Sequence, residues 1–136
     1  MRIPAKSELL KAAIHIRTHT LIEECFGTDW YTRGDPRPLL ELSFEDIQIH
    51  AHKQGLPATV LVENTWSGHE HFVISHQGSN WRVGYAERGN ASLISTHQSR
   101  EEALNSVARE LWYLFDLAGN PSVWKGGVAV GTPMPL

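Results

Sequence analysis

Bulky apolar residues alternate with polar ones between His69 and Ser95, which is the pattern of strands with one buried face. Gly78-Ser79 predicts a two-residue hairpin turn, and Gly89-Asn90 predicts the next one, which would place Tyr85 opposite Ile94. With a further strand at residues 58–64, the sequence indicates an antiparallel meander. The first turn predicts these cross-strand pairs on one apolar face: Phe72–Tyr85, Ile74–Val83 and His76–Trp81.

Helical patterns precede the strands. Ser7 is the expected cap of a helix through residues 8–26, which ends at Gly27 and is weakened in its middle by two threonines. Residues 28–39 contain prolines, Gly and Asp and predict a surface connection. Ser43 and Gly55 bound a second predicted helix, although its apolar residues also alternate as they would in a strand.

A third helix follows the strands. Ser99 and Glu102 form a capping box at its start, and Gly119 and Pro121 end it. A one-faced sheet must bury its apolar face, so this helix is its expected cover. The residues of its apolar stripe are Leu104, Val107, Ala108, Leu111, Phe115 and Ala118.

These elements predict an α+β fold: an antiparallel β-meander of about four strands packed against a C-terminal helix, with one or two N-terminal helices. A chain of 136 residues suits a single domain, residues 1–136. The Gly- and Pro-rich tail, residues 120–136, is expected to be irregular or partly mobile, with a short strand at residues 128–130 as its one regular element.

The composition of the chain argues against two classes of partner, nucleic acids and membranes. Hydrophobic residues make up 41% of the chain, and the formal net charge is −3, which gives no electrostatic reason to expect direct nucleic-acid binding. Cys25 is the only cysteine and lies in an apolar helical stripe, where a structural role is favoured. No window approaches the ~18 apolar residues of a membrane helix. We therefore expect a cytoplasmic protein with no membrane partner.

Eight histidines raise the question of a metal site. His69 and His71 would share one side of a strand, but His50 and His52 diverge on a helix, and no metal-binding spacing such as HExxH is present. Surface histidines are the simpler interpretation, and we expect no metal, no cofactor and no catalytic residue. A small histidine-dependent metal-binding protein or enzyme remains the alternative, and an RNA-associated adaptor is a third option.

Aromatic and acidic residues recur together in two predicted loops. Exposed aromatics serve as anchors for a protein partner, and acids speed the approach of a basic one. The competing interpretation is that Trp30 and Trp66 fold back over the sheet edges, since Trp is highly buried on average. The predicted partner-binding residues are Asp29, Trp30, Tyr31, Asp35, Glu63, Trp66 and Glu70.

A meander such as "HFVISHQGSNWRVGYAERGNASLIST", followed by a capped helix such as "SREEALNSVARELWYLF", resembles the immunity proteins of bacterial polymorphic toxin and contact-dependent growth inhibition systems. The resemblance covers about Thr59 to Phe115. It implies a non-enzymatic inhibitor that binds a cognate protein toxin, often a nuclease, by occluding its active site or its substrate surface. No binding residue is carried over from that family.

Overall fold

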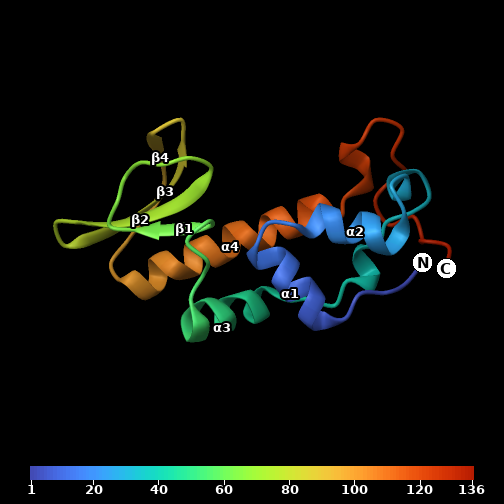
Figure 1. Cartoon of the computed structure of the whole chain (residues 1–136), viewed down its shortest axis with the longest axis horizontal. Coiled ribbons are helices and arrows are strands. Elements are labelled where there is room, and N and C mark those ends of the chain that lie inside the picture. The colour runs from blue at the N-terminus through green and yellow to red at the C-terminus, as the bar shows by residue number, and fades with distance from the viewer. The chain divides into compact units, whose positions relative to one another are not determined.

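The computed structural model describes all residues from Met1 to Leu136 and is an α+β protein, as predicted (Figure 1). Its backbone contacts form two compact units: unit 1 holds residues 1–43 and 112–136, and unit 2 holds residues 44–111. The predicted single domain stays a prediction. The helices are α1 (Lys6–Ile14), α2 (Thr18–Phe26), α3 (Phe44–Gln54) and α4 (Arg100–Ala118), and the strands are β1 (Leu61–Glu63), β2 (His71–Gln77), β3 (Asn80–Glu87) and β4 (Asn90–His97).

Unit 2 contains the sheet, whose strand order is β1-β2-β3-β4. The first predicted hairpin is confirmed, because Gly78 and Ser79 connect β2 to β3 and Gly78 has a φ of 61° that glycine adopts without strain. The observed register contains all three pairs expected from the sequence: Phe72–Tyr85, Ile74–Val83 and His76–Trp81.

The second predicted hairpin is present, but its turn lies one residue earlier in the chain than predicted. The turn is Arg88-Gly89, with both residues at positive φ, so Tyr85 lies opposite Ser92 rather than Ile94. The register then shifts between Val83 and Gly84, which bulges β4 at Ile94. Ile94 is consequently 40% exposed, so it does not extend the buried apolar face as the predicted pairing with Tyr85 implied.

Strand β1 pairs with β2 in parallel, so the predicted all-antiparallel meander is wrong at this strand. A parallel crossover normally takes a dozen or more residues, but here residues 64–70 suffice. Asn64, Gly68 and Glu70 all have positive φ, which reverses the chain within this short span. The reversal carries Trp66 over the sheet, where a Cβ on Gly84 would lie 2.6 Å from the indole.

Helix α4 begins at the predicted cap Ser99, but the second bond of the expected capping box comes from Gln98 rather than from Ser99. The Glu102 N–H donates to Ser99 Oγ at 3.2 Å, and the Gln98 N–H donates to the Glu102 carboxylate at 3.2 Å. Within unit 2 the helix packs on the sheet, and Ser106 Oγ lies 2.9 Å from Ser95 Oγ of β4. Its side chains buried in unit 2 are Ala103, Leu104, Val107, Ala108 and Leu111.

Helix α3 confirms the prediction that residues 43–55 form a helix rather than a strand. It ends before Gly55, which has a φ of 78°. Phe44 lies under the Arg109 guanidinium at 4.3 Å, and His52 Nε2 contacts Asn105 Oδ1, so α3 runs beside the first half of α4 (Figure 1).

The predicted N-terminal helix over residues 8–26 is two helices in unit 1. Ile16 adopts a left-handed φ of 55°, which ends α1, and α2 begins two residues later at the buried Thr18. Ser7 is not the cap: the helix starts after Ala5, whose N–H donates to Glu8. Cys25 is 1% exposed, which agrees with the structural role expected for it.

Residues 28–39 and the tail are held together in unit 1. The loop forms two short 3₁₀ helices, η1 (Trp30–Thr32) and η2 (Arg37–Leu39), and the tail forms η3 (Pro121–Val123). No strand forms at residues 128–130, so that prediction is wrong, but the tail is otherwise irregular, as expected. The backbone N–H of Asp35 donates to Thr132 at 2.7 Å, and Val128 donates to Tyr31 at 2.8 Å.

Candidate protein-binding site

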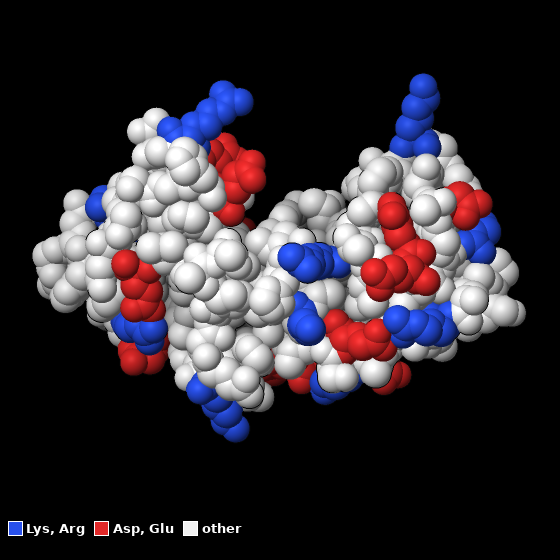
Figure 2. All heavy atoms as spheres, viewed as in Figure 1, with Lys and Arg blue, Asp and Glu red and all other residues white.

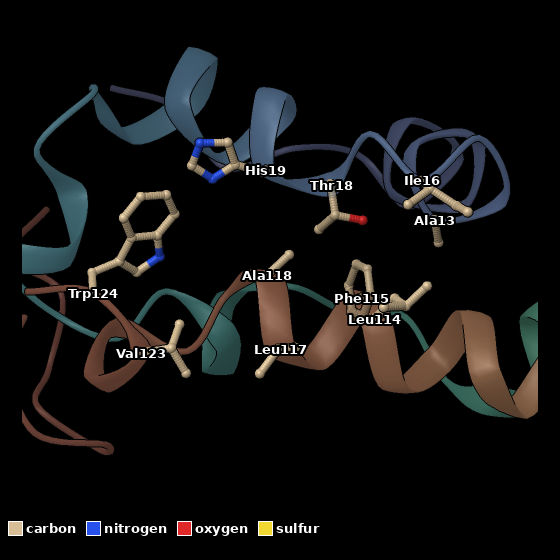
Figure 3. Close-up of a pocket in the computed structure, with 10 residues that line it drawn as sticks. All are labelled: Ala13, Ile16, Thr18, His19, Leu114, Phe115, Leu117, Ala118, Val123 and Trp124. Carbon is tan, nitrogen blue, oxygen red and sulfur yellow. The ribbon is translucent and has the colours of Figure 1, made fainter. Parts of the chain in front are cut away.

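An open pocket of about 280 Å³ lies in unit 1, and apolar side chains line most of it. Figure 3 shows that its walls come from three parts of the chain: helices α1 and α2 with the break between them, the second half of α4, and the end of η3 with the residue that follows it. The break supplies Ile16, α2 supplies His19, α4 supplies Leu117, and the end of η3 and the next residue supply Val123 and Trp124. The left-handed turn at Ile16 therefore shapes one wall of the pocket.

Stacked aromatic rings form one end of this pocket. The Trp124 indole stacks on His19 at 4.9 Å and on Tyr31 at 5.1 Å, with nearly parallel planes in both cases. Figure 3 shows the His19 and Trp124 rings next to each other at one end of the pocket. Trp30 supports the stack edge-on, 5.7 Å from Tyr31 and 6.4 Å from Trp124. We call His19, Tyr31 and Trp124 the aromatic stack.

Apolar side chains around the pocket are unusually exposed. Ile16 is 42% exposed, Val123 is 55% exposed and Trp124 is 37% exposed. Clustered apolar exposure is characteristic of interaction surfaces, whereas single exposed apolar residues are ordinary. The cluster is therefore the strongest candidate for a binding surface in unit 1.

Several polar and charged side chains of unit 1 are paired. His19 Nε2 lies 2.7 Å from Glu23 Oε1. Arg37 donates from Nη2 to Asp35 at 2.8 Å and also reaches Asp116 at 3.4 Å. The largest effect on the pKa of Asp35 is burial, which raises it, but the bonds from Arg37 and from the Gly131 N–H outweigh burial and lower the pKa. Asp35 and Arg37 thus form a structural ion pair.

The first loop predicted to bind a partner is only partly accessible. Trp30 is 0% exposed and Asp35 is 4% exposed, so the prediction that they are displayed to a partner is wrong. Trp30 supports the aromatic stack, and Asp35 ties the loop to the tail. Asp29 is exposed and Tyr31 is half-buried, and their binding role stays a prediction.

The second predicted loop belongs to unit 2. Trp66 packs on Gly84 and lies 3.8 Å below the Arg82 guanidinium, in agreement with the interpretation that it folds back onto the sheet. Glu63 binds Arg100. Glu70 is exposed in the loop that precedes β2. A binding role for Glu63, Trp66 and Glu70 stays a prediction.

The histidines proposed for the alternative metal site do not converge. No group of three or more His, Cys, Asp or Glu side chains is placed to hold a metal ion. Of the four candidates, His52 contacts Asn105 and His71 Nδ1 lies 3.2 Å from the Phe72 carbonyl oxygen. His50 lies on α3 and His69 precedes β2. The sequence-based alternative therefore gains no support from the geometry.

The sequence did not predict that the tail, through Trp124, lines a pocket. Trp124 was placed in a Gly- and Pro-rich end expected to be irregular, and His19 in the middle of one long helix. The available signal was Trp124 itself, since Trp is highly buried on average and one in a Gly- and Pro-rich segment is expected to pack against another part of the chain. No pattern in the sequence indicates its stacking on Tyr31.

Comparisons of the chain with protein-family models, with curated proteins and with solved structures found no match in any of the three. None of the helices combines the length and the apolar character that crossing a membrane requires.

Proposed function

We propose that the protein is an immunity-type inhibitor that binds and neutralises a basic protein toxin, and that the unit 1 pocket receives one bulky apolar side chain of that toxin. The observation that carries the proposal is the aromatic stack of His19, Tyr31 and Trp124 beside an open pocket of about 280 Å³. Rigid aromatics at the edge of a pocket are the typical anchors of protein interfaces.

The size of the pocket favours a side chain over a cofactor. Pockets for small molecules and cofactors span roughly 300–1,000 Å³. A pocket of about 280 Å³ lies just below that range and is open to solvent. It suits an anchor residue on a protein surface, with the rest of the interface formed around it.

The support from Trp30 reduces the cost of binding. Trp30 is fully buried beneath the aromatic stack, so Tyr31 and Trp124 are already held in place before a partner arrives. Side chains that are ordered in advance lose less conformational entropy in a complex.

Charge supports a basic partner. Unit 2 has eight acidic and five basic side chains, whereas unit 1 has seven of each, so the whole net charge of −3 lies in unit 2. Figure 2 shows the charged side chains of one face in small mixed groups rather than in one large patch. A diffuse acidic excess of this kind accelerates the approach of a basic protein without fixing its docking position.

The test uses the product of the gene adjacent to the one encoding this chain. That product is expressed in a bacterial host with the wild-type chain or with Trp124→Ala, and growth and the affinity of the purified pair are measured. We expect the wild-type chain to protect the host. Trp124→Ala should weaken binding by about 2 kcal/mol or more, roughly thirtyfold, because it removes an anchor.

Tyr113→Ala is the matched control, since Tyr113 is an aromatic on α4 that is 59% exposed and does not line the pocket. It should leave affinity unchanged. An adjacent gene product that is harmless to the host contradicts the toxin proposal. Binding that Trp124→Ala and Tyr113→Ala affect equally contradicts the assignment of the pocket.

A further inference from the structure

Strand β4 is an open edge of the sheet. It is the last strand in the order β1-β2-β3-β4, and it is extended over eight residues, Asn90–His97. Alternate residues of an edge strand direct their N–H and C=O groups away from the sheet, where another strand can pair with them. In the middle of β4, Leu93 is 62% exposed and Ile94 is 40% exposed.

The edge lacks the usual protection against pairing. Proteins protect long edge strands with charged side chains, with proline or with bulges. Strand β4, "NASLISTH", contains no acidic residue, no Lys or Arg, and no proline. The bulge at Ile94 is its one protective feature, and the strand remains extended on both sides of it.

The composition of β4 favours a second copy over a basic foreign strand. A basic strand would need carboxylates on β4 to recognise it, and there are none. The β4 strands of two copies contain no acidic residue, Lys or Arg, so they can pair antiparallel without placing like charges opposite each other, even though unit 2 is acidic as a whole. The hairpin end of one copy, with Glu87 and Arg88, would then face the helix end of the other, with Arg100 and Glu101. The hairpin end carries one charge of each sign. The helix end, which also holds Glu102, carries one basic and two acidic side chains, so each end offers the other a charge of opposite sign.

The opposite edge of the sheet limits the assembly to two copies. Strand β1 has only three residues, and its last residue, Glu63, is bound to Arg100. Growth of a filament would need β4 of one copy to pair with β1 of the next, which offers too short an edge. Pairing of β4 with β4 around a two-fold axis uses both long edges and closes the assembly.

We propose that the protein forms a two-fold symmetric dimer in which the β4 strands of two copies pair antiparallel and join the sheets into one eight-stranded sheet. This inference does not depend on the toxin proposal, because it uses a surface of unit 2 and needs no other protein.

Sedimentation equilibrium over a range of protein concentrations tests the dimer. We expect a mass that rises from the 15.3 kDa of one chain to twice that value. Leu93→Lys should raise the dissociation constant about tenfold, because it places like charges on both sides of the two-fold axis. An equimolar mixture of Leu93→Lys and Leu93→Glu should restore dimerisation, since the introduced charges then attract.

Ser79→Lys adds the same charge at the exposed turn of the first hairpin and should leave the dissociation constant unchanged. Circular dichroism checks that all variants keep the fold. The proposal is overturned by a mass of one chain at every concentration, by a dimer that Leu93→Lys does not weaken, by a mixture that stays monomeric, or by a mass that grows beyond two chains.

Discussion

At the scale of single residues, Asp35 and Trp30 were expected to bind a partner but instead hold the fold together. An Asp in a loop rich in Gly and Pro reads as a solvated turn residue, but Asp35 accepts bonds from Arg37 and from Gly131, which is 96 positions away. Its role depends on a long-range contact that no local pattern encodes. Trp30 is similar, because its exposure depends on how the tail packs over it.

Asp35 should make the stability of the protein depend on acid pH. Its folded-state pKa is lowered, so its contribution to stability is complete above the unfolded-state pKa of about 3.9 and is lost as the pH falls through the folded-state value. Asp35→Asn should cost roughly 3 kcal/mol at pH 7, because it leaves the Arg37 guanidinium without its main partner. Urea unfolding between pH 7 and pH 2 measures the difference.

The gap between wild type and Asp35→Asn should narrow as the pH falls below about 4, because Asp35 then takes up a proton in the unfolded state while it stays charged in the folded one. It should be smallest below the lowered folded-state pKa, where the Asp35 side chain is uncharged in both states. Asp29→Asn is the control, because its side chain is 69% exposed and should change stability little at any pH. A gap that is the same at pH 7 and at pH 2 would show that the Asp35 charge does not stabilise the fold.

At the scale of elements, the sequence predicted those features that local chemistry determines. The Gly78-Ser79 turn has a glycine at the position with positive φ, and the three pairs that follow from it are all present. The Ser99 cap of α4 and the end of α3 at Gly55 were predicted for the same reason. The parallel direction of β1 could not be predicted, because three residues carry no signal for it.

The prediction of the second turn failed because the observed turn contains Arg88, a residue that rarely adopts positive φ. In the Arg88-Gly89 turn both residues have positive φ, and Asn-Gly is the pair that suits this geometry. Placing glycine first, as the sequence suggested, shifts the pairing by two residues at Tyr85. The break between α1 and α2 was missed for the same reason, since Ile16 is a β-branched residue in a left-handed conformation.

Arg88→Asn should therefore stabilise the protein by about 0.5–1 kcal/mol, because Asn adopts a left-handed conformation more readily than Arg does. The midpoint of urea unfolding measures the gain. Arg88→Ala removes the same charge but keeps an unfavourable residue in the turn, and it should bring no gain. Equal stabilisation by both variants would assign the effect to charge rather than to the turn.

At the scale of the whole molecule, helix α4 belongs to both compact units. Residues up to Leu111 lie in unit 2, and residues from Trp112 onward lie in unit 1. A continuous helix cannot lose its structure in one unit without fraying into the other. The expectation of a single domain therefore becomes an expectation of one cooperative unfolding transition.

Leu111→Ala tests this expectation, because Leu111 is 0% exposed at the point where α4 passes from one unit to the other. The variant should lose about 2–5 kcal/mol of stability. Hydrogen exchange with mass spectrometry should show equal loss of protection in α2 of unit 1 and in β3 of unit 2. Tyr113→Ala is the exposed control. Loss of protection in one unit alone would mean that the two units unfold separately.

The bond between the Asp35 carboxylate and the Gly131 amide also orders events during biosynthesis. While the ribosome is still translating the residues between them, the Asp35 carboxylate has no Gly131 N–H from which to accept a hydrogen bond. Trp30 is likewise not yet covered by the Trp124 indole. The nascent chain must therefore carry this apolar region uncovered until Gly131 emerges, and the interval before that point is the one in which a chaperone has most to protect.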